Sequence, residues 1–260
     1  MKQYLMDEFI NRLDTALFER TNGFWNNLML NDPWSVGYVT TLIEMRTFDN
    51  KEDWESFYYE LGEERDSKIS RLSIELQNKI NDEQLVVKNK GEIYNLSWDI
   101  KNLNYNYGRT KQQIAKKGTL LFKHAQAQGV IISKEDCVEA VRYRTICQTW
   151  NGVIVRERNT IRTLKSKFPE LDFVSTSGDF DHKYAVDYEI KSNNELICGI
   201  QIKPKSYFGN APYLRKAQTA NARKNQEYKN QCGKTVFNVI SKANGEILNT
   251  EVIGQIANIK

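Results

Sequence analysis

Two strand-like segments joined by a pair of asparagines constrain the fold of this chain more than any other feature. Residues 183–192, KYAVDYEIKS, alternate in polarity and are rich in Val, Tyr and Ile, which is typical of a strand. Residues 195–207, ELICGIQIKPKSY, begin as an apolar strand and end in lysines. Asn193 and Asn194 between them suit a two-residue turn, because asparagine tolerates a positive φ angle. The pattern predicts an antiparallel hairpin.

The returning strand of this hairpin carries two polar side chains on one face. Gln201 and Lys203 are two residues apart, and side chains at that spacing point the same way from a strand. A two-residue loop pairs residues whose numbers sum to 387, so Gln201 lies opposite Val186 and beside Asp187. A three-residue loop puts Gln201 directly opposite Asp187. In either register Asp187, Gln201 and Lys203 converge across adjacent strands.

An aspartate, an amide and a lysine on one patch of sheet suit metal-assisted chemistry. Asp187 and Gln201 offer oxygen atoms, the ligands that Mg²⁺ prefers. The Lys203 ammonium is suited to hold an attacking water and to stabilise developing negative charge. Glu157 adds an acid on the helical face that also carries Ile154, Ile161, Leu164 and Phe168. A buried carboxylate must be paired or metal-bound, so an ion pair with Arg156, Arg158 or a core lysine is the competing interpretation.

The chain divides by sequence pattern into two parts. Residues 1–150 read as a mainly helical region, suited to DNA contact, dimerisation or both. Residues 151–260 read in the order helix, three strands, helix, strand. The sequence therefore predicts an α/β (α+β) protein with a C-terminal αβββαβ core.

Composition and charge narrow the function class. Hydrophobic residues make up 40% of the 260 residues, enough for a real core, and no apolar run is long enough to span a membrane. The four cysteines lack metal-site spacing, and we expect reduced thiols in a cytoplasmic protein. The net charge is +4, yet residues 201–234 hold eight basic residues against one acid. Such a concentration of positive charge indicates a polyanionic partner.

The αβββαβ order, with Asp187 on one strand and Gln201-Ile202-Lys203 on the next, resembles the PD-(D/E)XK nuclease superfamily. Val186-Asp187 stands where that superfamily has Pro-Asp, and Gln201 stands at its second acidic position. Losing the proline matters little, because the carboxylate does the chemistry. Losing the acid matters more, because an amide oxygen is a weaker metal ligand and carries no charge.

A narrower resemblance covers most of residues 149–250. The segments TWNGVIVRERNT, KYAVDYEI, GIQIKPKSYF and APYLRKAQTAN are similar to the MjaI-type restriction endonuclease family. The resemblance implies a type II restriction endonuclease that uses Mg²⁺ to cut double-stranded DNA at a short palindrome, with CTAG as the expected site, and acts as a homodimer. It implies Asp187, Gln201, Lys203 and Glu157 as catalytic residues. The metal ligands would be Asp187, Gln201 and the backbone carbonyl of Ile202.

DNA contacts are expected from two segments. Basic residues that follow Lys203 are placed to meet phosphates, and asparagine suits adenine edges. The C-terminal candidates are Lys205, Tyr207, Arg215, Lys216, Asn221, Arg223 and Lys224. The candidates in the N-terminal half are Arg109, Lys116 and Lys117.

Other interpretations of the same residues remain open. Glu189-Ile190-Lys191 is a literal Glu-x-Lys, preceded by Asp179 and Asp181 in a loop, and it is a rival to the Gln201-x-Lys203 site. Glu189 also suits a supporting role, because it shares a strand face with Asp187. A repair or recombination nuclease of the same fold is one alternative function. A DNA-binding module that has lost catalysis is another, favoured by Gln201.

Overall fold

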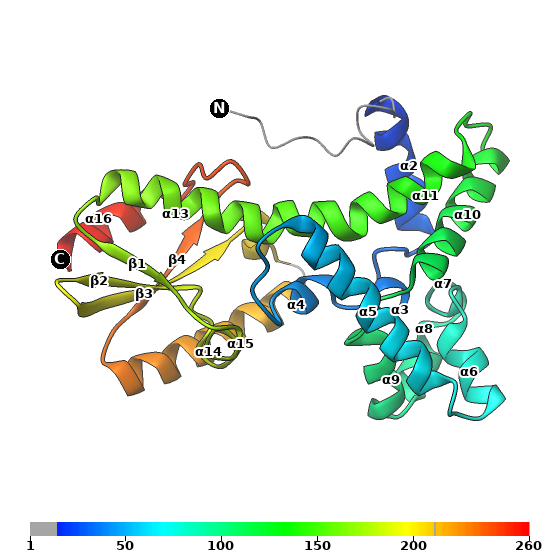
Figure 1. The fold of residues 1–260 in the computed structure, drawn as a ribbon, viewed down its shortest axis with the longest axis horizontal. Helices are drawn as coiled ribbons and strands as arrows, with labels where there is room; N and C mark the ends of the chain where they lie inside the picture. Colours follow the sequence, from blue (N-terminus) through cyan, green and yellow to red (C-terminus); the bar gives the residue numbers. More distant parts are fainter. Residues whose placement is uncertain (1–14, 211, 260) are drawn as a thin grey trace. The chain divides into compact units, whose positions relative to one another are not determined.

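The computed structural model of this chain describes residues 15–210 and 212–259, so the first fourteen residues of the predicted helical region lie outside it. The chain forms two compact units (Figure 1). The first comprises the described residues up to Glu44 together with Phe48–Trp150, and the second comprises Met45–Thr47 and residues from Asn151 onward. Among the described residues, no helix is long and apolar enough to cross a membrane.

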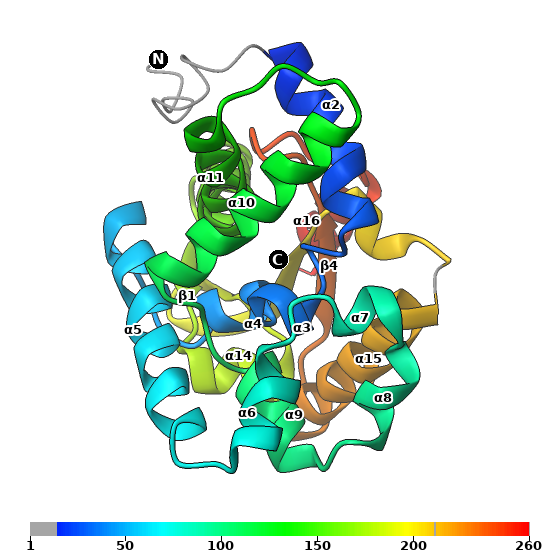
Figure 2. The ribbon, with the colours of Figure 1, turned by 90° about the vertical axis from the view of Figure 1, so that its right-hand side faces the viewer.

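The first unit is helical. Its core is built around Trp54 and Tyr58, whose polar atoms donate hydrogen bonds to the carbonyls of Ile146, at 3.2 Å, and Val36, at 3.0 Å. Helices α10 and α11 lie side by side (Figure 2), and a Cβ on Gly118 would come within 2.4 Å of Val138 Cα. Its helices are α2 (Thr15–Asn27), α3 (Pro33–Val36), α4 (Val39–Ile43), α5 (Lys51–Ile69), α6 (Ile74–Asn81), α7 (Leu85–Lys88), α8 (Lys90–Asn95), α9 (Trp98–Tyr105), α10 (Lys111–Ala127), α11 (Lys134–Arg142), η1 (Tyr143–Cys147) and α12 (Gln148–Trp150).

The second unit is a four-stranded mixed sheet covered by helices on both faces. Its strands lie in the order β1-β2-β3-β4; β1–β2 and β2–β3 are antiparallel, and β3–β4 is parallel. The fold class is therefore α+β, and the predicted αβββαβ order is confirmed, with one further short helix between the first two strands. The elements are η2 (Asn151–Val155), α13 (Arg156–Lys167), β1 (Asp172–Ser175), α14 (Gly178–Tyr184), β2 (Tyr188–Ser192), β3 (Glu195–Lys203), η3 (Lys205–Phe208), α15 (Pro212–Cys232), β4 (Val236–Ile240) and α16 (Glu251–Asn258).

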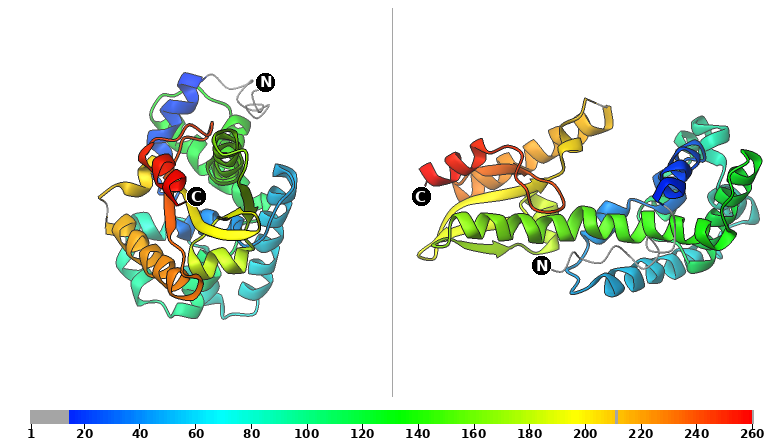
Figure 3. Two further views of the ribbon diagram at one scale, coloured as in Figure 1. Left: turned by 90° about the vertical axis from the view of Figure 1, so that its left-hand side faces the viewer. Right: turned by 90° about the horizontal axis from the view of Figure 1, so that it is seen from above.

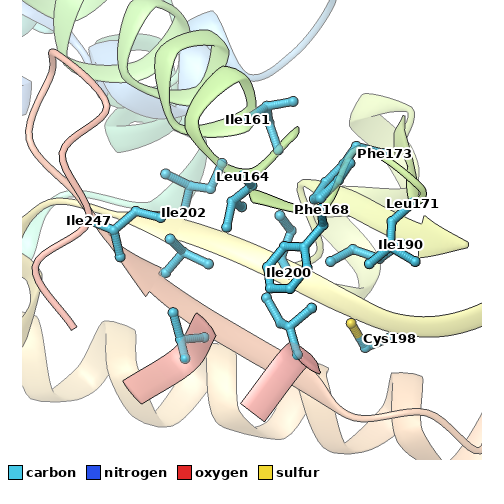
Figure 4. Packing of buried hydrophobic residues seen from close by; sticks show 13 residues of the cluster. Ile161, Leu164, Phe168, Leu171, Phe173, Ile190, Cys198, Ile200, Ile202 and Ile247 are labelled. Carbon is cyan, nitrogen blue, oxygen red and sulfur yellow. The ribbon is translucent and has the colours of Figure 1, made fainter. Parts of the chain in front are cut away.

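Helices α13 and α16 cover one face of this sheet, and α14 and α15 cover the other (Figures 1 and 3). The main apolar core lies on the α13 side, where Leu164 points toward the strand that carries Ile200 and Ile202 (Figure 4). A smaller cluster of Tyr184, Val186 and Tyr228 lies on the α15 side. Because side chains alternate along a strand, Gln201 and Lys203 face α14 and α15.

The hairpin turn forms as the sequence predicts, but its register changes along the strands. Asn193 and Asn194 have φ angles of 50° and 65°, as a two-residue turn requires. Next to the turn, Lys191 pairs with Leu196, in agreement with the sum of 387. A β-bulge then shifts the register, so that Tyr188 pairs with Ile200. One residue further, this register puts Asp187 opposite Gln201, which is the alternative predicted from a longer loop.

The segment TSGDFDHK is a short helix rather than the predicted loop. The Ser177 side chain caps α14 by accepting a hydrogen bond from the Phe180 amide at 3.3 Å. Phe180 and Tyr184 pack against Tyr228 of α15, which stabilises the helix by burying its aromatic side chains.

Candidate active site

The structure brings Asp187, Gln201 and Lys203 together on the α15 face of the sheet. Asp187 directly precedes β2, and its Oδ2 accepts a hydrogen bond from the Ile202 amide at 2.5 Å. Gln201 is buried in β3, with 1% of its surface exposed, and Lys203 is half-buried at the end of the same strand. The Lys203 charge acts on the Asp187 carboxyl. The convergence predicted from the hairpin is therefore present.

Asp187 has an unusual environment for a carboxylate. Removal from water raises its pKa to about 7, against the lowering effects of the Lys203 charge and the Ile202 amide. Asp181 raises the pKa further, through its own charge and a side-chain hydrogen bond to Asp187. Two carboxyl groups in contact share a proton readily, and a bound cation would replace that proton.

The contact between Asp181 and Asp187 is not predicted from the sequence, where Asp181 belongs to the rival Glu189-Ile190-Lys191 site. The missing information is helix α14, which carries Asp181 on the turn just before Ala185. A serine cap followed by an acidic first turn is the sequence signal that would have indicated this helix.

Two buried amide oxygens on this face have no hydrogen-bond partner among the described residues, so they are available as metal ligands. These are Gln201 Oε1 and Asn238 Oδ1. Gln201 pairs with Asn238 across β3 and β4, so Asp187, Gln201 and Asn238 follow one another across three adjacent strands. Oxygen atoms from carboxylates and amides suit Mg²⁺. Within residues 15–210 and 212–259, no group of three or more His, Cys, Asp or Glu is arranged to hold a metal. A Mg²⁺ ion here would therefore use amide or backbone oxygens as well.

Glu157 lies in the first turn of α13 and is half-buried. Its charge acts on the hydroxyl of Tyr188, whose pKa rises to about 12, mainly through burial and then through Glu157 and Asp187. Glu157 is therefore near the start of β2, but α13 covers the face opposite to Gln201 and Lys203. Its predicted catalytic role stays a prediction.

Glu189 and Lys191, the rival pair, lie on the same strand face as Asp187. The Glu189 carboxylate accepts a hydrogen bond from the Tyr228 hydroxyl at 3.1 Å, and Lys191 Nζ lies 3.9 Å from it. Tyr228 is fully buried, so this bond fixes Glu189 against α15. The interactions suit a residue that supports the face on which Asp187 lies.

A pocket of about 380 Å³ lies between α15 and the sheet. Gln201, Asn238, Tyr207 and Asn221 are among the residues that line it. The Tyr207 ring centre lies 6.0 Å from Lys203 Nζ, and its hydroxyl accepts a hydrogen bond from Asn221 Nδ2 at 2.9 Å. Asn221, predicted to read bases, thus holds Tyr207 beside the pocket.

The predicted phosphate contacts differ in exposure. Lys205, Arg215, Lys216 and Arg223 are exposed, and Lys224 is half-buried. The Arg223 guanidinium lies 3.9 Å from the Glu227 carboxylate. The C-terminal unit therefore presents basic side chains on α15 and on the segment that follows Lys203.

Two of the three DNA contacts predicted in the helical unit are buried, although a DNA contact must be exposed. Arg109 is 2% exposed, and its guanidinium donates to backbone carbonyls, including that of Trp34 at 2.8 Å. Lys117 is also 2% exposed and pairs with Glu83 at 3.5 Å. Both cations are held inside the helical core, so neither side chain is exposed to contact DNA phosphates. Lys116 is exposed.

A family model described as MjaI restriction endonuclease matches residues 21–249. No curated protein and no solved structure matches the chain.

Proposed function

The chain belongs to the MjaI restriction endonuclease family, and we propose that it is a type II enzyme that uses Mg²⁺ to hydrolyse double-stranded DNA at a short palindrome, with CTAG as the expected site. The observation that carries the proposal is the meeting of Asp187, Gln201 and Lys203 at one end of the β2–β3 hairpin. Family membership makes the chain a DNA-binding nuclease.

The chemistry assigned to this site divides among a few residues. Asp187, Gln201 and the Ile202 carbonyl would hold the ion, and Glu157 would act as an outer ligand. When bound, Mg²⁺ supplies a Lewis acid that polarises the phosphate and lowers the pKa of water. Lys203 orients the attacking water and stabilises the negative charge that develops on the phosphate. The Ile202 amide fixes the Asp187 carboxylate by its 2.5 Å hydrogen bond.

DNA binding by the C-terminal unit would use its exposed basic residues. Arg215, Lys216 and Lys205 are placed on and before α15, where they would contact phosphates and set the position of the duplex. The Tyr207 ring centre lies 6.0 Å from Lys203 Nζ, so Tyr207 would contact the DNA beside the scissile phosphate. A palindromic site is matched by a two-fold symmetric pair of chains, which supports a homodimer.

One observation favours a second function. Gln201 removes a negative charge from the expected metal site, and the same fold without catalysis would be a DNA-binding module. Incubation of the protein with plasmid and Mg²⁺, beside a Lys203→Ala variant, distinguishes the two. We expect discrete fragments from the wild type and at least about a hundredfold slower cleavage by the variant, because the group that stabilises the developing charge is lost.

Each other outcome has a definite meaning. Equal cleavage by both proteins would reject Lys203 as a catalytic residue. DNA binding without cleavage by either protein would favour the inactive module. Cleavage that follows DNA structure rather than one sequence would favour a repair or recombination nuclease.

A further inference from the structure

The candidate site lacks one negative charge. Mg²⁺ in enzymes is commonly bound through one or two carboxylates, and the amide at Gln201 supplies an oxygen but no charge. Lys203 adds a positive charge beside Asp187. A divalent cation would therefore meet a site with no net negative charge if Asp187 were its only carboxylate.

Helix α14 brings a second carboxylate to this point. The helix ends at Tyr184, and the next residue, Ala185, has a φ of 54° and donates its amide hydrogen to the Asp181 carbonyl at 2.7 Å. A left-handed conformation is unfavourable for alanine, and here it turns the chain sharply into buried Val186 and then Asp187. The turn brings Asp181 back to Asp187, and their side chains form a hydrogen bond.

The contact between Asp181 and Asp187 is unfavourable unless a proton or a cation separates the two charges. Gln201 lies on the same face and directly across from Asp187 in the observed register, and its buried Oε1 has no partner among the described residues. Two carboxylates in contact with each other thus lie across the strands from one unpartnered amide oxygen, and Lys203 acts on one of the two carboxylates. These oxygen atoms are a donor set suited to a hard divalent cation.

We propose that Asp181 is the second metal-binding carboxylate of this site, so that helix α14 supplies the charge that strand β3 lacks at Gln201. The proposal rests on the metal-dependent function proposed above. Glu189 is the competing source of that charge, but its carboxylate is held by Tyr228 at 3.1 Å and by Lys191 at 3.9 Å. The Asp181 side chain instead contacts Asp187, the first metal ligand of the proposed site.

The test compares Asp181→Asn with Asp179→Asn, which removes an exposed acid from the same helix. Binding of Mn²⁺ to each full-length protein is measured by isothermal titration calorimetry without DNA. We expect Asp181→Asn to weaken Mn²⁺ binding by at least about tenfold, since loss even of a supporting group has that effect, and Asp179→Asn to leave it unchanged. Neither variant should lower the thermal unfolding midpoint without metal, because Asp181→Asn removes a repulsion and Asp179 is exposed.

A second variant tests the exchange of charge directly. Asp181→Asn combined with Gln201→Glu returns the acid to strand β3, and we expect it to recover Mn²⁺ affinity to within about threefold of wild type, a difference of roughly 0.7 kcal/mol. If the wild type binds Mn²⁺ and cleaves DNA, and Asp181→Asn has the same Mn²⁺ affinity, the role of Asp181 is overturned but the proposed function is not. A wild type that neither binds Mn²⁺ nor cleaves would overturn the proposed function and the inference together.

Discussion

At the scale of single residues, Asp187 joins most of the interactions in the candidate site. Its carboxylate accepts a hydrogen bond from the Ile202 amide, contacts the Asp181 side chain and is attracted by the positive charge of Lys203. Burial and Asp181 act against its negative charge, while Lys203 and the amide favour it. A residue held in such a balance is typical of functional sites rather than of stable cores.

Replacing Asp187 by asparagine separates function from stability. We expect Asp187→Asn to lower the rate of Mg²⁺-dependent plasmid cleavage by at least about a hundredfold, because the charged ligand is lost. The thermal unfolding midpoint without metal should not fall, because the amide has no buried charge and does not repel Asp181. Fragment yield and differential scanning calorimetry measure the two effects.

The matched control is Asp172→Asn, which changes an exposed aspartate of strand β1 and should leave cleavage unchanged. Normal cleavage by Asp187→Asn would transfer the candidate site to Glu189-Ile190-Lys191. A large loss of stability in Asp187→Asn would instead identify Asp187 as a structural residue of the hairpin.

At the scale of elements, buried cations shape the helical unit. Lys117 of α10 lies in a pocket whose lining also includes Arg65, Arg109 and Glu83. Burial lowers the pKa of Lys117 to about 8, assisted by the charges of Arg109 and Arg65 and opposed by Glu83. An unfolded lysine titrates near 10.4, so the folded chain releases this proton at a lower pH than the unfolded chain.

The sign of the resulting pH dependence follows from linkage. Below pH 8 Lys117 is charged in both states, and the cost of burying it is fully present. Between about pH 8 and 10 the unfolded chain holds the extra proton, so the contribution of Lys117 to stability rises with pH, by at most about 1.4 kcal/mol per pH unit. Lys117→Met should abolish this rise, and the exposed neighbour variant Lys116→Met should keep it.

Tryptophan fluorescence is the suitable probe, because all five tryptophans lie in the helical unit. Urea unfolding of wild type and both variants at pH 7, 8.5 and 10 gives the required free energies. The same pH slope in wild type and in Lys117→Met would show that Lys117 keeps an ordinary pKa.

The elements also show where sequence reasoning succeeds and where it stops. The turn at Asn193 and Asn194 is local chemistry, so two residues predict it. The bulge between β2 and β3 depends on how the whole strand packs, and no single residue of the hairpin predicts it. The serine cap of α14 is visible in the sequence, but the contact that the helix makes depends on the packing of Phe180 and Tyr184 against Tyr228, which is remote in sequence.

The burial of charged residues also depends on the folded chain and cannot be predicted from single residues. Arg109 looks like a DNA contact in the sequence because arginine is usually exposed. In the fold, backbone carbonyls from separate segments, including those of Trp34 and Asn104, accept its hydrogen bonds and make burial possible. Such a set of acceptors exists only after the chain has folded, so sequence alone does not separate a structural arginine from a surface one.

At the scale of the whole molecule, charge and function are distributed unevenly along the chain. Residues 201–234 hold eight basic residues and one acid, although the chain as a whole has a net charge of only +4. This segment begins at the candidate site and continues along α15, so its attraction for DNA phosphates acts close to the proposed chemistry. The part of the chain that the structure describes carries one proposed active site, whereas a double-strand break requires hydrolysis of two phosphodiester bonds.

A pair of chains on one palindrome would place one site at each strand. We therefore expect two chains per duplex when the Lys203→Ala variant, which should bind without cutting, is mixed with Mg²⁺ and a short duplex containing CTAG. Sedimentation equilibrium at 0.15 M salt measures this ratio, and a duplex of the same length with the four bases scrambled is the control. The scrambled duplex should bind more weakly, by at least about tenfold, because a wrong base pair costs about 1–3 kcal/mol. A ratio of one chain per duplex would exclude the homodimer, and equal affinity for both duplexes would exclude CTAG as the recognition site.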